Sequence, residues 1–93
     1  MQPLAPDQIA TRLQQLEGWS LTPEGIRKQF ALGSFPSAIN LVNRVADLAE
    51  QASHHPDILI RYDKVTFTLT THDAGGVTAK DFDLAARIEA IAP

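Results

Sequence analysis

The sequence contains no cysteine, no long apolar run and no excess of basic residues. The lack of cysteine excludes disulfide bonds, thiolate metal sites and cysteine nucleophiles. No run approaches the ~18 apolar residues of a membrane span, and the N-terminus lacks the basic and apolar segments of a secretory signal. The net charge of −3 argues against nucleic acid as a primary partner, because phosphate binding normally needs a basic surface. These absences predict a cytoplasmic protein with neither membrane nor nucleic acid as its partner.

The composition that remains is typical of a small globular domain. Of the 93 residues, 44% are hydrophobic and 20% are charged, which predicts one domain over residues 1–93. A chain this short buries a modest core and is often stabilised by oligomerisation.

Apolar residues at helical spacing predict three helices, and runs rich in Ile, Val, Thr and aromatic residues predict four strands. The predicted helices span residues 6–16, 35–52 and 78–91, and the predicted strands span residues 19–22, 26–32, 58–62 and 65–71. In this order, αββαββα, the economical arrangement is an α+β fold, a four-stranded antiparallel sheet with three helices packed on one face. Thr78 and Asp81 resemble a capping box at the start of the last helix.

The helix predicted over residues 35–52 is apolar over more of its circumference than one sheet-facing stripe requires. We expect Leu41, Val45, Leu48 and Ala52 to form a second contact surface. The hypothesis is that this helix packs on the sheet and also against a partner subunit. The alternative is a helix that is well buried in a single core.

All three histidines lie around the second predicted hairpin, and the turn of that hairpin decides whether they meet. A three-residue loop centred on Asp63 would place His54 opposite His72. A two-residue loop at Asp63-Lys64 would place His55 opposite His72 instead. Directly opposed residues have Cβ atoms roughly 4.5–5.5 Å apart, so either register brings His72 near one of the paired histidines.

Four interpretations of the histidines remain open. They can be structural, they can bind a metal, they can carry protons in catalysis, or they can belong to an interaction module without chemistry. Adjacent histidines tend to point opposite ways in extended chain, and the HExxH metal spacing is absent, so a metal site fits poorly. Acid–base catalysis on a small molecule fits better, because histidine can carry a proton either way near neutral pH.

The residues near the histidines also have two interpretations each. Glu50 lies four residues before His54 and could orient that ring if the helix continues, or it could be a solvated charge. Asp81 could orient a histidine or only cap a helix. Tyr62 could contact a substrate or belong to the core.

These residues form a recognisable pattern, in which an acid precedes His-His-Pro and an aromatic residue, a third histidine and a second acid follow. They are Glu50, His54-His55-Pro56, Tyr62, His72 and Asp81. With this pattern the chain resembles the pterin-4a-carbinolamine dehydratase (4a-hydroxytetrahydrobiopterin dehydratase) family over nearly its whole length. It departs from the family at Ile58 and Ile60, where the animal enzymes often carry Trp and Asn, and at Ser53, where Asp or Asn occurs. These departures bear on pterin contacts more than on the reaction, because all three histidines remain.

The resemblance implies a dehydration without cofactor or metal, in which 4a-hydroxytetrahydropterin loses water to give quinonoid dihydropterin. It implies that His54 and His72 are the acids at the 4a-hydroxyl. His55 would bind the pterin, as would Tyr62, or assist proton transfer. Glu50 and Asp81 would orient these rings.

The resemblance also implies partners. The family forms dimers and tetramers through sheet edges and the long helix, so a homodimer or homotetramer is expected, and an aromatic amino acid hydroxylase is a candidate partner. Some members bind other proteins, as a coactivator or an assembly factor. An oligomeric protein-binding module is therefore the alternative function, although the intact set of three histidines favours catalysis.

Overall fold

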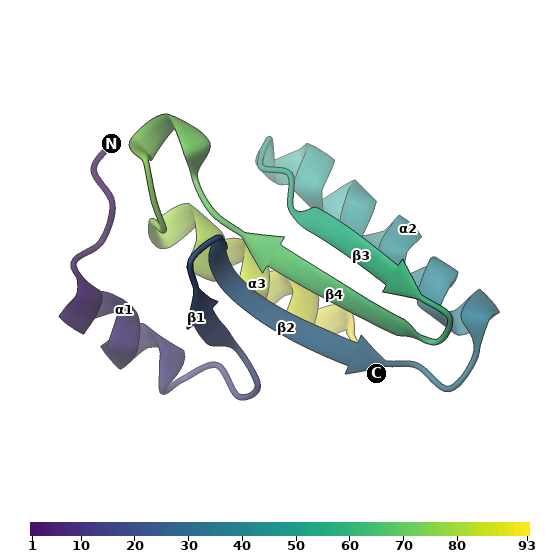
Figure 1. The fold of residues 1–93 in the computed structure, drawn as a ribbon. Helices are drawn as coiled ribbons and strands as arrows, with labels where there is room; N and C mark the ends of the chain where they lie inside the picture. Colours follow the sequence, from purple (N-terminus) through teal and green to yellow (C-terminus); the bar gives the residue numbers. More distant parts are fainter.

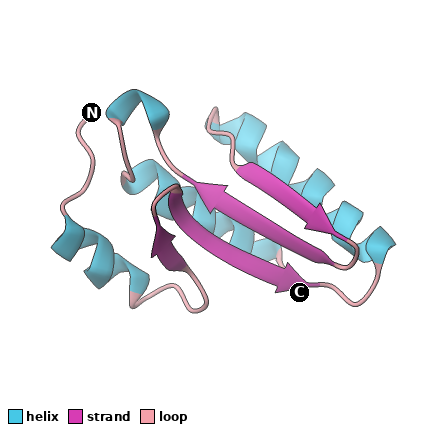
Figure 2. Cartoon of the chain, viewed as in Figure 1, coloured by secondary structure: helices cyan, strands magenta, loops and turns pink.

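The computed structural model describes residues 1–93 as three α-helices and a four-stranded sheet, with one short 3-10 helix (Figures 1 and 2). The elements are α1 (Pro6–Leu13), β1 (Ser20–Thr22), β2 (Gly25–Ala31), α2 (Phe35–Ala52), β3 (Asp57–Arg61), β4 (Lys64–Leu69), η1 (His72–Ala74) and α3 (Ala79–Ile91). The strands are antiparallel in the order β1-β2-β4-β3. The predicted α+β fold and the order αββαββα are therefore confirmed. Helices α2 and α3 lie behind the sheet in Figure 1, and the face toward the viewer carries no helix.

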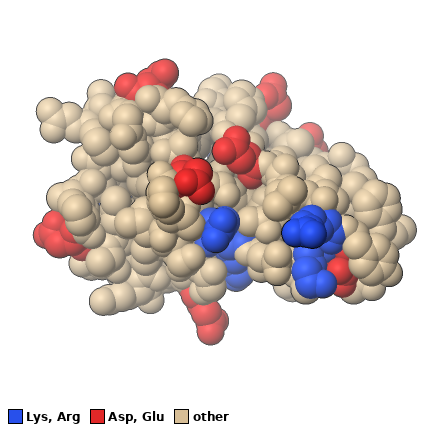
Figure 3. All heavy atoms as spheres, viewed as in Figure 1, with Lys and Arg blue, Asp and Glu red and all other residues tan.

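The core lies between the sheet and the helices, because alternate residues of the two central strands point toward α2 and α3. The buried residues of β2 and β4 are Ile26, Phe30, Val65, Phe67 and Leu69. Their neighbours along the strands, such as Arg27 and Thr68, point to the helix-free face. On that face, basic side chains gather in small groups over the strands and acidic side chains are scattered around them, rather than forming one continuous basic surface (Figure 3). No helix combines the length and apolarity needed to cross a membrane.

Helix α2 has the predicted bounds, but its predicted second contact surface is wrong. Leu41 and Val45 are only 2% and 0% exposed, because they face the sheet within the same chain. Leu48 is partly buried against the same core. A row at i, i+4, i+7 spacing marks one buried face of a helix, and here that face is the one the core already covers.

Helix α1 is shorter than predicted and ends at Leu13 rather than at residue 16. The chain continues through tighter turns, in which the N–H of Gln15 donates to the carbonyl of Arg12 at 3.1 Å. Leu13 and Leu16 still pack against the core. The apolar spacing thus identified buried positions beyond the end of the helix itself.

The register of the β3–β4 hairpin differs from both predicted registers. Arg61 pairs with Lys64, so the loop consists of Tyr62 and Asp63. This loop requires a positive φ of 54° at Tyr62, a conformation that bulky residues rarely adopt. The ladder ends at Asp57, next to Pro56, which has no N–H to donate. No histidine is therefore directly opposed to another in the sheet, and the loops beyond the ladder decide where the rings lie.

No three of the chain's histidine, aspartate and glutamate side chains are grouped as the ligands of a metal ion would be.

Candidate active site

The end of helix α2 delivers the two adjacent histidines. Ser53 takes a left-handed conformation with φ of 50° and ends the helix. The backbone N–H of His54 then donates to the carbonyl of Ala49 at 3.0 Å, which satisfies one of the last free carbonyls of the helix. This sharp end turns the chain toward β3 and leaves His54 and His55 at one edge of the sheet.

The loop after β4 brings the third histidine to the same edge. Thr71 and Gly76 form an isolated antiparallel bridge, with backbone hydrogen bonds of 3.1 and 3.3 Å. The bridge closes the loop that contains η1, and His72 is the first residue of η1. Because the start of β3 is adjacent to the end of β4, His72 comes near His54 and His55 without any ladder pairing.

His54 is bound by a buried carboxylate. Its Nε2 lies 2.5 Å from Oδ1 of Asp81, and the side chains are 11% and 0% exposed. The other oxygen, Oδ2, accepts a hydrogen bond from the hydroxyl of Thr71 at 2.9 Å and one from the backbone N–H of Thr78 at 2.8 Å. Asp81 is thus both the predicted cap of α3, with Thr78, and the partner of His54.

The directions of these hydrogen bonds follow from the donors available. The Thr71 hydroxyl donates its hydrogen to Asp81, so it accepts a hydrogen bond from the Thr78 hydroxyl at 2.8 Å. The Thr78 oxygen in turn accepts a hydrogen bond from the backbone N–H of Lys80 at 3.2 Å. Every neighbour of Oδ2 is a donor, which suits an ionised carboxylate. Nε2 of His54 therefore carries the hydrogen shared with Oδ1.

The remaining ring nitrogen of His54, Nδ1, has no hydrogen-bond partner within the chain. No fully buried side-chain nitrogen or oxygen lacks a partner, so Nδ1 is not fully buried, and the His54 side chain lines a pocket that opens to solvent. With Nε2 held by Asp81, Nδ1 is the atom at which His54 can take up or release a proton.

His55 has a carboxylate partner of a different kind. Its Nε2 hydrogen-bonds to Oε2 of Glu50, but the two side chains are 66% and 77% exposed. Glu50 contacts His55 rather than His54, because α2 ends before His54 instead of continuing through it. An exposed pair of this kind holds its partners weakly.

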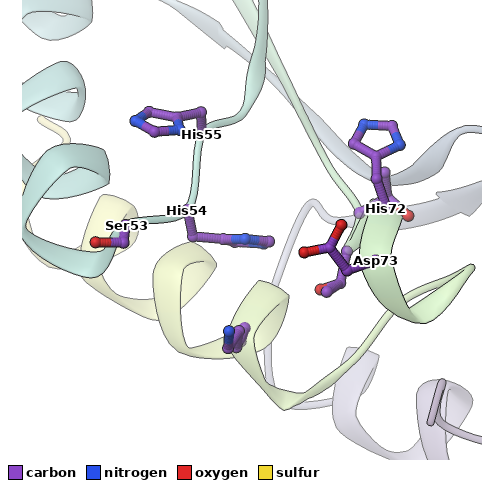
Figure 4. A pocket seen from close by; sticks show the side chains of 8 residues that line it. Ser53, His54, His55, His72 and Asp73 are labelled. Atoms are coloured by element: carbon purple, nitrogen blue, oxygen red, sulfur yellow. The ribbon is translucent and has the colours of Figure 1, made fainter. Parts of the chain in front are cut away.

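The three histidines line one polar pocket of about 250 Å³. Its other lining residues are Ser53, Thr70, Thr71, Asp73 and Lys80. In Figure 4 the His54 ring points across the pocket toward Asp73, with His55 above it on the same segment and His72 on the facing segment. A pocket of this size, lined by convergent polar groups, suits a small polar molecule.

Tyr62 does not line this pocket. It lies in the β3–β4 turn, at the end of β4 remote from His72, and is 70% exposed. Among the residues that the sequence did not single out, Thr71 is the most consequential. The alternation along β4 could have identified it, because Thr71 falls on the same side as Val65, Phe67 and Leu69. A threonine on that buried side needs a hydrogen-bond partner inside the protein.

The chain is similar to known proteins in both sequence and fold. Residues 2–91 match the family model described as pterin 4 alpha carbinolamine dehydratase. Relatives that bear the pterin-4-alpha-carbinolamine dehydratase name include one from Roseiflexus sp. (strain RS-1), 59% identical over 88 residues and 95% of each chain. Another, from Nocardia farcinica, is 53% identical over 89 residues, which is 96% of this chain and 94% of the relative. The crystal structure of a transcriptional coactivator/pterin dehydratase from Brucella melitensis has a TM-score of 0.93 and 32% identity, over 98% of this chain and 99% of that chain.

Proposed function

Because the chain belongs to the pterin-4-alpha-carbinolamine dehydratase family and is a hydro-lyase of that kind, we propose that its three histidines carry out the dehydration by acid–base catalysis. The substrate is a 4a-hydroxytetrahydropterin, and the products are quinonoid dihydropterin and water. The reaction would serve to recycle the pterin that an aromatic amino acid hydroxylase has used. The observation that carries the proposal is a polar pocket lined by all three histidines, one of them held by a buried carboxylate. A cytoplasmic location stays a prediction from the sequence.

The reaction requires two proton movements. The bond between C4a and its hydroxyl oxygen breaks, and because hydroxide is a poor leaving group, the oxygen must receive a proton and depart as water. The proton on N5 is lost, and the electron pair forms the C4a=N5 double bond. A positioned acid or base is typically worth ~10²–10⁴ in rate, so one protonated and one neutral imidazole suit this reaction.

His54 and His72 are the residues we propose as acids at the 4a-hydroxyl. Asp81 keeps a hydrogen on Nε2 of His54, so the accessible Nδ1 exchanges the proton with the substrate. When Nδ1 is protonated, the buried carboxylate stabilises the positive ring. His55, exposed and only weakly held by Glu50, can turn to bind the pterin or assist proton transfer.

The test is a dehydration assay, in which a hydroxylase generates the 4a-hydroxytetrahydropterin and its ultraviolet decay is followed. We expect His55→Ala and His72→Ala each to lower turnover at least about tenfold without unfolding the domain, as circular dichroism would verify. Gln29→Ala, on the exposed helix-free face, is the control and should leave turnover at the wild-type rate. Wild-type turnover in both histidine variants would contradict the site.

The edge strand β3 supports an oligomeric state in addition. One side of β3 pairs with β4, and the other leaves its backbone groups unpaired. Ile58, Leu59 and Ile60 are 36%, 55% and 37% exposed along this edge. We propose that two copies pair through β3, so a mass measurement at micromolar concentration should give a dimer or a tetramer. A monomer at that concentration would rule this out.

A protein-binding module remains the alternative function, favoured by the coactivator name of the Brucella melitensis structure. A folded protein that gives no acceleration over the spontaneous rate would favour this alternative.

A further inference from the structure

The N-terminal segment, residues 1–5, precedes α1 and belongs to no helix or strand, yet it is bound to the loop that leads from β4 to α3 (Figure 1). The backbone N–H of Leu4 donates to the carbonyl of Val77 at 2.8 Å. The Leu4 side chain packs against the hydrophobic core, and Val77 is only 4% exposed. The segment is therefore held both by a backbone hydrogen bond and by apolar burial.

Pro3 lies against the same loop, one residue earlier. Gly76 has no side chain, and a Cβ there would lie 3.0 Å from Cβ and 3.6 Å from Cγ of Pro3. The first of these separations is shorter than the optimum of about 3.5–4.0 Å between carbon atoms. The Pro3 ring can thus approach the loop this closely because residue 76 is glycine.

The residue that Pro3 contacts holds the loop of His72. Gly76 and Thr71 exchange two backbone hydrogen bonds, of 3.1 and 3.3 Å, which close this loop. Thr71 directly precedes His72, the first residue of η1. Unlike the other two histidines, His72 has no carboxylate partner. The position of its ring therefore depends on the backbone of the loop.

The next two residues lead to the other proposed acid. Val77, which binds Leu4, is followed by Thr78, whose backbone N–H donates to Oδ2 of Asp81 at 2.8 Å. Oδ1 of the same carboxylate binds Nε2 of His54. Residues 76–78 thus connect the loop of His72 to the carboxylate that holds His54, and the N-terminal segment contacts the first two of these three residues.

Resting on the proposed function, we propose that the N-terminal segment is a positioning element for the proton transfers. It does not line the pocket, so it acts through residues 76–78 and not on the substrate. Misplacing a catalytic group by about 1 Å can lower a rate by about 10²-fold. A loop can also open locally while the rest of the domain stays folded. Without the segment, kcat should therefore fall in a protein that still folds.

The test is a shortened chain that lacks residues 2–4 and so joins Met1 to Ala5, directly before α1. We expect the amide hydrogens of Thr71 and Gly76 to exchange with solvent at least about tenfold faster, because their loop opens more often. In the dehydration assay kcat should fall about threefold to tenfold, and KM should change by less than about twofold. Circular dichroism and urea unfolding verify that the shortened chain is folded.

Leu13→Ala is the matched control. Leu13, like Leu4, is partly buried against the core, but it forms no hydrogen bond to residues 76–78. The control loses a comparable apolar contact and should keep wild-type kcat and wild-type exchange at Thr71 and Gly76. An equal loss of kcat in Leu13→Ala would overturn the proposal, because the effect would then come from lower stability of the whole domain.

Gly76→Ala tests the same contact in a chain of full length. The new Cβ would displace Pro3, so kcat should fall about twofold to fivefold, as for coupled neighbours. Adding Pro3→Gly removes the ring that the Cβ meets, and kcat should recover in the double variant. A loss that persists in the double variant would contradict the proposal, because the methyl group would then act on the loop directly.

Hydrogen exchange separates this inference from the proposed function. Folded wild-type protein that does not accelerate the dehydration would overturn the proposed function, whatever the exchange rates show. Wild-type acceleration, with kcat and exchange both unchanged in the shortened chain, would overturn only the positioning role of the N-terminal segment.

Discussion

Two adjacent histidines that line the pocket each pair with a carboxylate, and the two pairs differ in their surroundings. His54 meets Asp81 where the side chains are 11% and 0% exposed, and His55 meets Glu50 where they are 66% and 77% exposed. Asp81 also accepts two hydrogen bonds from residues near the start of α3 and the end of β4, whereas Glu50 accepts no other side-chain hydrogen bond. Each pair thus joins an imidazole to a carboxylate, but the first lies inside a buried hydrogen-bond network and the second is exposed to water.

The difference shows that burial, rather than the contact itself, determines how strongly a carboxylate acts on its histidine. In the low dielectric of the interior, electrostatic interactions are strong. Removing one partner of a buried pair therefore leaves the charge of the other uncompensated. In water the same contact is screened and typically contributes ~0–1 kcal/mol. The first pair can therefore fix the tautomer and the position of its ring, and the second leaves its ring free to adapt to a ligand.

Asp81→Asn is expected to have the largest effect. The amide would keep its oxygen toward the Thr78 N–H and turn its NH₂ toward His54. Nε2 would then accept a hydrogen bond, and the ring hydrogen would move to Nδ1. A ring that accepts a hydrogen bond at Nε2 cannot carry hydrogens on both nitrogens, so the variant would lose the protonated form in which His54 acts as an acid through Nδ1. Turnover should therefore fall by about 10²–10⁴, as for other histidines held in the wrong tautomer.

The tautomer can be read directly from nitrogen NMR chemical shifts of His54 in the wild type and the variant. Unchanged shifts with unchanged turnover would show that Asp81 is only a helix cap. A loss of turnover in a folded variant with unchanged shifts would show that the charge of Asp81, and not the tautomer, carries its effect.

Thr71→Val tests the network around the buried pair and should have an intermediate effect. Valine has nearly the same shape, but it removes a donor to Asp81 and the acceptor of the Thr78 hydroxyl. Leaving a buried polar group unsatisfied lowers the free energy of unfolding by about 1–3 kcal/mol. The urea concentration at the unfolding midpoint should therefore fall. Thr68→Val, on the helix-free face, is the matched control and should change stability by less than about 0.5 kcal/mol.

The order of elements was predictable because local patterns specify it. The helical apolar spacing of residues 35–52 and the strand-forming runs rich in Ile, Val, Thr and aromatic residues each act over a few residues. The β3–β4 register was not predictable, because it depends on Tyr62 taking a left-handed conformation that its residue type disfavours. The cost of that conformation is offset by pairing across the whole hairpin, which no local pattern reveals.

In the candidate site, too, the sequence predicts local contacts but not those that depend on tertiary packing. The capping role of Asp81 with Thr78 was predictable, since both residues lie within one helical turn. Its contact with His54 was not, because it joins the end of α2 to the start of α3 through the packing of both helices. Glu50 illustrates the reverse case: its spacing to His54 suggested a contact, and the left-handed Ser53 directed it to His55 instead.

The smallest effect is expected for Glu50→Gln, which leaves the exposed pair without its charge. Because water already screens this contact, the free energy of unfolding should change by less than about 0.5 kcal/mol. The His55 ring keeps a hydrogen-bonding neighbour, so turnover should fall far less than in Asp81→Asn. Urea unfolding at low and high salt, together with the dehydration assay, checks both expectations. A loss of turnover as large as that of Asp81→Asn would mean that the carboxylate of Glu50 acts on the reacting atoms themselves, and that exposure is not what separates the two pairs.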